Sequence, residues 1–229
     1  MIEQKPHPAK FSEGIVDTIA EELYKMDVDG PIVDPFAGTG GIHDLYDVYG
    51  HETYGIELEP EWAIAHPRNI CGDSRQLKAL LKEHQISPAV IATSVSYGNR
   101  MADNYAGDAK GSKRYTYRVF LGRKLTEGNS ASMQWGRKYR KFHDEFWQEA
   151  YDILSEHKDG KHNRGIIFVN VSNHIRSGEE IQVVNFHRDS LKSAGFQIIS
   201  TKDLITRRMG HGANRELRPD SEKLLIGRV

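Results

Sequence analysis

The stretch that decides the fold is DPFAGTGG, residues 34–41, which follows a short apolar run at residues 31–33. Gly38 and Gly40 permit a tight turn and let a ligand approach the backbone closely. The free amide groups at the start of the following helix favour an anionic or carboxylate group. The turn lacks the last glycine of the dinucleotide fingerprint GxGxxG, and no GK[ST] follows it. Neither a dinucleotide fingerprint nor a phosphate-binding P-loop is therefore complete.

Outward from this turn, apolar runs alternate with helical patterns along the chain. Such alternation is typical of a mostly parallel, doubly wound α/β sheet, in which ligands bind at the carboxyl ends of the strands. Four expected strands end in or beside residues that can do chemistry, Asp34, Glu57, Asp73 and Ser94. We expect strands within residues 31–34, 52–57, 63–71, 89–93, 165–171, 196–200 and 223–227, and helices within residues 14–26, 41–49, 59–65, 74–84, 142–155 and 183–194.

The composition is that of a soluble globular protein, with 28% charged and 38% hydrophobic residues. We expect one domain over residues 1–229, with a basic insertion at about 98–141. Cys71 is the single cysteine, so no disulfide can form within the chain, and a cytoplasmic location is expected. No signal peptide, membrane span or metal-ligand spacing is apparent in the sequence.

Three side chains can complete a cofactor site beside the glycine turn. Glu57 closes the second expected strand, where an acid can accept hydrogen bonds from two ribose hydroxyls. Trp62 can cover a purine ring, or it packs in the core. Asp73 can accept from an exocyclic amine, or it caps a helix together with Ser74. The set fits S-adenosylmethionine better than NAD, because the dinucleotide fingerprint is incomplete.

DPFAGTG, Glu57 and Asp73 resemble the S-adenosylmethionine-binding motifs of the DNA amino-methyltransferases, which methylate adenine N6 or cytosine N4. KPHPAKF at 5–11 is similar to the motif before the first strand of these enzymes, although a proline-rich entry loop is the alternative. TSVSYGNRMAD at 93–103 and NVSNHIR at 170–176 are similar to motifs of short site-specific DNA methylases carried by phages. The resemblance implies a Rossmann-like methyltransferase fold whose seven-stranded, mostly parallel sheet has an antiparallel last strand. The implied cofactor-binding residues are Phe11, Asp34, Pro35, Phe36, Ala37, Gly38, Thr39, Gly40, Glu57, Trp62 and Asp73.

In this family the fourth strand ends in Asp, Asn or Ser, then Pro-Pro and an aromatic residue. The resemblance implies that Ser94 and the Val95 carbonyl hold the target amine, and that Tyr97 stacks on a base flipped out of the duplex. Val95 and Ser96 replace the two prolines, so the acceptors are held less tightly. An active enzyme and a DNA-binding relative without catalysis both stay open. Ser94 favours cytosine N4, and adenine N6 stays open.

The same resemblance places Asn170 and residues 172–176 at the mouth of the active site, although a plain loop is the alternative.

Residues 98–141 carry a charge that the neutral total hides. They hold 11 Lys or Arg and 3 acidic residues, so the segment is 11 − 3 = +8 and the remainder is −1 − 8 = −9. Basic residues with interleaved aromatics are typical of a nucleic-acid surface, and a solvated insertion is the alternative. The loop 206–219 is a second basic candidate, which would lie in a groove of the nucleic acid. A plain hairpin loop is the alternative. The residues expected to contact DNA, most simply a duplex, are Arg100, Lys113, Arg114, Arg118, Arg123, Lys124, Arg207 and Arg208.

Other activities are also compatible with parts of the sequence. A related enzyme can methylate a base amine of RNA. A small-molecule methyltransferase fits worst, because the +8 segment would have no purpose. Carbon-5 methylation by Cys71 fits poorly because no Pro-Cys pair is present, and we expect this cysteine to be a small buried apolar residue. No separate recognition domain is apparent, so we expect recognition of DNA to use the segments 98–141 and 206–219, a partner protein, or a second copy of the chain in a homodimer.

Overall fold

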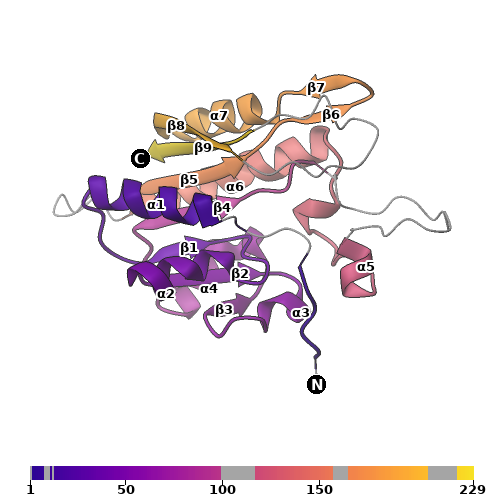
Figure 1. The fold of residues 1–229 in the computed structure, drawn as a ribbon, viewed down its shortest axis with the longest axis horizontal. Coiled ribbons are helices and arrows are strands. Elements are labelled where there is room, and N and C mark those ends of the chain that lie inside the picture. The colour runs from indigo at the N-terminus through magenta and orange to yellow at the C-terminus, as the bar shows by residue number, and fades with distance from the viewer. Residues whose placement is uncertain (1, 8–10, 12, 99–116, 157–164, 206–220) are drawn as a thin grey trace.

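A computed structural model gives the fold and describes residues 2–7, 11, 13–98, 117–156, 165–205 and 221–229. The described residues form a seven-stranded sheet with the order β3-β2-β1-β4-β5-β9-β8. The strands from β3 to β5 are parallel, whereas β9 is antiparallel to both β5 and β8. This topology confirms the expected doubly wound, mostly parallel sheet with an antiparallel last strand (Figure 1).

The elements have the following bounds. The large sheet contains β1 (Ile32–Asp34), β2 (Thr53–Glu57), β3 (Asn69–Cys71), β4 (Val90–Ser94), β5 (Ile166–Val171), β8 (Gln197–Ile205) and β9 (Ser221–Arg228). A separate hairpin contains β6 (His174–Arg176) and β7 (Glu179–Ile181). The helices are α1 (Glu13–Lys25), α2 (Asp44–Tyr49), α3 (Pro60–Ala63), α4 (Leu77–Glu83), α5 (Tyr117–Leu121), α6 (Arg137–Ser155) and α7 (Val183–Ala194), with 3₁₀ turns η1 (Gly41–His43), η2 (Ser74–Gln76) and η3 (Ser130–Ser132).

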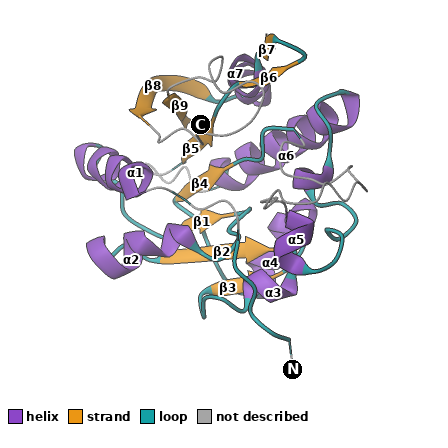
Figure 2. Cartoon of the chain, turned by 45° about the vertical axis from the view of Figure 1, so that its right-hand side comes forward, coloured by secondary structure: helices purple, strands orange, loops and turns teal. Residues whose placement is uncertain are grey.

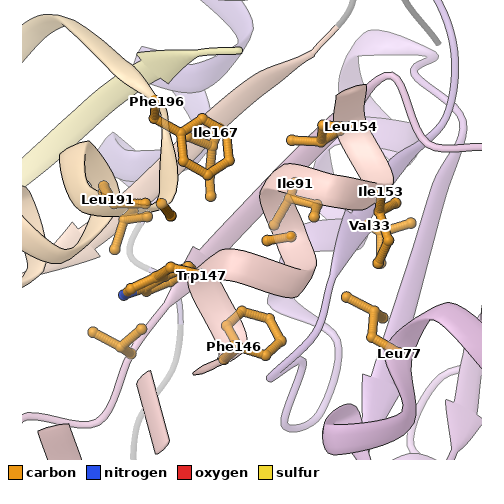
Figure 3. Packing of buried hydrophobic residues seen from close by; sticks show 14 of the residues in the cluster. Val33, Leu77, Ile91, Phe146, Trp147, Ile153, Leu154, Ile167, Leu191 and Phe196 are labelled. Carbon is orange, nitrogen blue, oxygen red and sulfur yellow. The ribbon is translucent and has the colours of Figure 1, made fainter. Parts of the chain in front are cut away.

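The central strands are buried on both faces. Ile91 and Ile167 belong to one apolar cluster with residues of α4, α6 and α7. Their neighbours Val90 and Ile166 belong to a second cluster with residues of α1 and α2. Alternate residues of a strand face opposite sides, which explains the continuous apolar runs of β4 and β5. Figure 2 shows α1 and α2 on one side of the sheet and α4 and α6 on the other, and Figure 3 shows the first cluster around Trp147 of α6.

The sequence analysis predicted most helices and strands, but it missed or underestimated the length of those without a regular spacing of apolar residues. The helix α6 begins at Arg137, five residues before the expected start at 142, because its first turn is largely basic. The strand β8 runs to Ile205, beyond the expected end at residue 200. The sequence did not indicate this extension, because β8 is an edge strand with alternating exposed residues and has no continuous apolar run. The short helix α5 and the hairpin β6–β7 were not expected.

Candidate active site

The carboxyl ends of β1, β2 and β4 meet at one edge of the sheet, because these strands are parallel and adjacent. They bring Asp34, Glu57 and Ser94 to the same edge. A direct bond joins two of these strands, since the hydroxyl of Thr93 donates to Oδ1 of Asp34 at 2.7 Å. Ser94 is the next residue of β4 after Thr93. The residue predicted to hold the amine therefore directly follows the residue that binds the predicted cofactor residue Asp34.

Asp34 is a fully buried carboxylate with only part of its bonding capacity used. Its Oδ1 also accepts from the backbone N–H of Phe36 at 2.9 Å. Its Oδ2 has no hydrogen-bond partner among the described residues. Burial raises the pKa of Asp34 to about 7, while the bonds from Thr93 and Phe36 oppose the rise. A buried carboxylate oxygen without a donor is costly, so a cationic or N–H ligand would be a favourable partner.

Glu57 connects the glycine turn to α3. Its Oε2 accepts from the N–H of Gly38 at 2.8 Å, and its Oε1 accepts from the N–H of Glu59 at 2.7 Å. Burial raises the pKa of Glu57 to about 7, although these two amides oppose the rise. Each carboxylate oxygen has two acceptor positions, so Glu57 can hold the turn and still accept two hydroxyl groups.

The turn 38–41 requires glycine. Gly38 and Gly40 have φ values of 56° and 89°. A Cβ at Gly40 would lie 2.6 Å from Cδ2 of His43, and a Cβ at Gly41 would lie 3.0 Å from Cβ of Phe11. Phe11, one of the predicted cofactor residues, therefore packs directly over the turn.

The other residues of the stretch 34–41 are held by neighbouring elements. The carbonyl of Pro35 accepts from the hydroxyl of Ser74, and the N–H of Ala37 donates to the carbonyl of Ile56 at 3.0 Å. The ring of Phe36 lies 4.9 Å from that of Phe146, and Thr39 is half-buried. The turn thus has a defined shape within the protein alone.

Trp62 is buried against α5. Its ring lies 4.3 Å from that of His7 and 5.6 Å from that of Tyr117, and its Nε1 donates to the Pro6 carbonyl at 3.2 Å. The alternative of a core residue fits this burial, and a role as purine cover stays a prediction.

Asp73 accepts from the N–H of Arg75 at 3.0 Å and pairs with its guanidinium. This geometry fits the alternative of a helix cap, and the amine-acceptor role of Asp73 stays a prediction.

The loop after β4, residues 94–97, is held by contacts from three directions. The N–H of Val95 donates to the Asn170 carbonyl at 3.2 Å. The hydroxyl of Tyr139 donates to the Ser96 carbonyl at 2.6 Å, and the Ser96 hydroxyl lies 3.4 Å from that of Ser130. These contacts restrain a loop that has no proline of its own.

Tyr139 is itself oriented by His187 of α7. The indole Nε1 of Trp147 can only donate, and it lies 3.2 Å from Nδ1 of His187, so this nitrogen is the acceptor. The proton of His187 is therefore on Nε2, which donates to the Tyr139 hydroxyl at 2.9 Å. Burial lowers the pKa of His187 well below its usual value and keeps the ring neutral. A fixed chain of donors thus runs from α7 through α6 to the Ser96 carbonyl.

A second polar group surrounds Ser94 and Tyr97. The amide Nδ2 of Asn170 donates to Ser94 Oγ at 3.1 Å and to Oε2 of Glu222 at 2.7 Å. Burial raises the pKa of the Tyr97 hydroxyl well above its usual value, and the charge of Glu222 raises it further. The predicted residues Ser94 and Tyr97 are therefore brought together, and Glu222 joins them from β9.

Arg123 connects the basic insertion to α3. Its guanidinium pairs with Glu59 at 2.7 Å and with Glu61. Glu59 is fully buried and also accepts from Thr126 and Asn129, so its carboxylate is fully satisfied. These pairs explain Arg123 without a nucleic acid, and its contact with DNA stays a prediction.

The other predicted DNA contacts are only partly described. Lys124 is exposed, whereas Arg100, Lys113, Arg114, Arg207, Arg208 and the side chain of Arg118 lie outside the described residues. Four further exposed cations, Arg137, Lys138, Arg140 and Lys141, occupy the start of α6. The helix macrodipole disfavours positive charge there, although Lys141 pairs with Glu145 at 3.5 Å and the guanidinium of Arg140 lies 5.6 Å from the centroid of the Trp135 ring.

Cys71 corrects one expectation. It is exposed, not buried, because it is the last residue of the edge strand β3. Desolvation and the charges of Glu57, Glu59 and Glu61 raise the pKa of its thiol, which disfavours a thiolate nucleophile.

Among the described residues, no group of three or more His, Cys, Asp or Glu side chains could hold a metal ion. No helix in the described part of the chain is long and apolar enough to cross a membrane.

Sequence reasoning missed Glu222, Tyr139 and His187. Glu222 could have been suspected, because an antiparallel last strand begins at the edge where the parallel strands end. Tyr139 and His187 gave no such signal, since each lies on a helix far from residues 94–97 in sequence.

No family model matches the chain, and no curated protein matches it in sequence. Solved structures do match its fold. An S-adenosylmethionine-dependent methyltransferase from Clostridium acetobutylicum has a TM-score of 0.52 and 11% identity, over 95% of this chain and 91% of that chain. The CcbJ methyltransferase from Streptomyces caelestis has the same TM-score and identity, over 98% and 92%. A putative sarcosine dimethylglycine methyltransferase from Galdieria sulphuraria has a TM-score of 0.51 and 10% identity, over 98% and 93%. The chain therefore has the Rossmann-like fold of S-adenosylmethionine-dependent methyltransferases.

Proposed function

We propose that this protein transfers a methyl group from S-adenosylmethionine to an exocyclic amine of a base in DNA, cytosine N4 or adenine N6. The observation that carries the proposal is the position of Ser94. Ser94 directly follows Thr93, whose hydroxyl binds the carboxylate of Asp34. An amine acceptor would therefore lie next to the end of β1, where the cofactor is expected to bind. The methyltransferase fold supports methyl transfer, and the DNA substrate comes from the motifs and charges.

The residues at the ends of β1 and β2 fit S-adenosylmethionine. The unpartnered Oδ2 of Asp34 would accept from the ammonium group of the methionine portion. The remaining acceptor positions of Glu57 would take the ribose hydroxyls. When bound, the cofactor would supply an electrophilic methyl group.

The residues after β4 would hold the base. Ser94 Oγ and the Val95 carbonyl would accept the two hydrogens of the amine, which turns its lone pair toward the methyl group. Tyr97 would stack on the flipped base, and such stacking contributes roughly 1–3 kcal/mol. Flipping costs a few kcal/mol in a duplex, so stacking offsets part of that cost.

The start of α6 would contact the nucleic-acid backbone. Tyr139 reaches the Ser96 carbonyl from this turn, so the exposed cations beside it lie close to the proposed base site. Lys and Arg side chains bind phosphates without reading sequence.

A second candidate is a DNA-binding protein without catalysis. The replacement of both prolines by Val95 and Ser96 favours it, since a displacement of about 1 Å can reduce a rate on the order of 100-fold. The bonds from Tyr139 and Asn170 weigh against it, because they restrain the same loop.

The test is transfer of labelled methyl from S-adenosylmethionine to mixed-sequence duplex DNA, single-stranded DNA and RNA, followed by digestion and mass identification of the nucleoside. We expect N4-methylcytosine or N6-methyladenine in DNA. Methyl transfer to RNA alone would refute the DNA substrate. Cofactor binding without transfer to any nucleic acid would favour the candidate without catalysis.

A further inference from the structure

Glu222 lies at the edge of the sheet where the parallel strands end. The strand β9 runs antiparallel to β5, with Lys223 opposite Val171, the last residue of β5, so Glu222 extends beyond the end of β5. Glu222 is half-buried there, and its carboxylate reaches Asn170. No other part of the proposed mechanism uses this acid.

The carboxylate of Glu222 fixes the orientation of the Asn170 amide. A carboxylate can only accept, so the atom of Asn170 that lies 2.7 Å from Oε2 must be the N–H₂ group. The same group donates to Ser94 Oγ at 3.1 Å. Asn170 is 1% exposed, and its Oδ1 has no partner among the described residues. Without Glu222, the amide could turn and present its oxygen to Ser94.

This orientation determines what Ser94 offers to a ligand. Its oxygen already receives one N–H from Asn170, so the amide does not compete for the hydroxyl proton. The hydroxyl can turn its proton toward Tyr97, which lies within its reach, and keep one lone pair for a donor. A hydrogen of an amine is such a donor, and a carbonyl oxygen is not.

We infer that Glu222 is a positioning residue of the target-base site, which sets Ser94 as an acceptor through Asn170 and supplies the negative charge of the site. This inference rests on the proposed methyl transfer. As the N–C bond forms and the S–C bond breaks with its electron pair going to sulfur, the amine nitrogen becomes positive until it releases a proton to solvent. A nearby carboxylate stabilises that charge, whereas the strand-end residue Ser94 is neutral.

The test compares Glu222→Gln with Glu222→Asp and with the wild-type protein, in methyl transfer to the DNA that the wild type modifies. Glutamine keeps a similar shape but removes the charge. We expect kcat to fall about 10- to 100-fold in Glu222→Gln, with unchanged affinity for S-adenosylmethionine. Glu222→Asp should retain part of the lost rate, because it retains the charge.

Asp203→Asn is the matched control. Asp203 is an exposed acid of the same β8–β9 ladder and pairs with Lys223, the neighbour of Glu222. Its loss should leave kcat unchanged. Melting temperatures of all variants separate a folding defect from a defect in turnover.

Equal kcat in Glu222→Gln and the wild type would overturn the inference and leave the proposed function intact. A parallel loss of melting temperature, cofactor affinity and kcat in both Glu222 variants would also overturn it, since that pattern indicates a structural role. A wild-type protein that methylates no nucleic acid would refute the proposed function itself, and this inference with it.

Discussion

The two halves of the candidate active site differ in how far they depend on contacts between distant residues. At the ends of β1 and β2, Asp34 and Glu57 each bind an amide two residues further along the chain, at Phe36 and Glu59, besides their longer-range bonds from Thr93 and Gly38. At the ends of β4 and β5, the bonds to Ser96 and Ser94 span 43 and 76 residues. A local bond forms wherever the turn forms, whereas a distant bond depends on the packing of the whole domain. We therefore expect the first half to tolerate remote substitutions and the second half to respond to them.

The largest effect should come from Asp34→Asn. The amide cannot replace the negative charge of Oδ2, so the affinity for S-adenosylmethionine should fall on the order of 100-fold. The free protein should be no less stable than the wild type at pH 8, because a buried charge is removed. Titration calorimetry and thermal melting measure the two quantities. Unchanged affinity would show that Asp34 does not bind the cofactor.

A smaller effect should come from Tyr139→Phe, which removes the donor to Ser96 and leaves His187 without its acceptor. We expect a loss of about 1–3 kcal/mol in the free energy of unfolding and a fall in kcat of about 10- to 100-fold. The affinity for S-adenosylmethionine should be unchanged, because the bonds of the Tyr139 hydroxyl go to Ser96 and His187 and not to Asp34 or Glu57.

Tyr151→Phe is the control for that experiment, since it removes a hydroxyl from the same helix near Phe196. If Tyr139→Phe turned over at the rate of this control, the loop would not depend on α6.

The pH dependence of cofactor binding should be steep. The pKa values of Asp34 and Glu57 are both raised to about 7, and their ionised forms are the acceptors. Each acid should therefore contribute about 10-fold between pH 6 and pH 8, so the affinity should be about 100-fold higher at pH 8. Asp34→Asn should reduce this dependence to the roughly 10-fold that Glu57 contributes, and an affinity that rises toward pH 6 would contradict the roles of both acids.

The same pKa values make a prediction for stability. The folded pKa of each acid lies above its ordinary value of 3.8 or 4.5, so the folded protein binds more protons than the unfolded chain from about pH 4 to pH 7. These two groups should therefore lower the stability of the ligand-free protein as the pH rises through that window. Denaturant melts at several pH values, with Asp34→Asn as comparison, measure this contribution.

The smallest effect should come from Lys138→Gln with Arg140→Gln. Both side chains are exposed at the start of α6, so their loss should weaken DNA binding only a few-fold near 0.1 M salt. The slope of log affinity against log salt should fall by about 2, one for each lost phosphate contact. An unchanged slope would place the DNA elsewhere. Lys82→Gln, on α4, is a control with no expected effect.

The sequence predicted what is local and missed what is distant. The glycine turn, the order of strands and helices, and the acids that end β1 and β2 follow from short motifs and periodicity. Tyr139 and His187 could not be placed beside residues 94–97, because their positions depend on helix packing. Glu222 could have been suspected there only from the expected antiparallel last strand. Arg123 shows the same limit from the other side. A basic residue in a basic segment indicated DNA, yet its partners Glu59 and Glu61 lie about 60 residues earlier.

The most direct test of two separable halves is Tyr97→Ala, with S-adenosylmethionine affinity and methyl transfer measured on the same sample. The proposed roles predict wild-type affinity and no detectable transfer, because the base would lose its stacking partner while Asp34 and Glu57 stay in place. Transfer at the wild-type rate would contradict the role of Tyr97 as the base platform. Loss of affinity and transfer together would contradict the separation of the two halves.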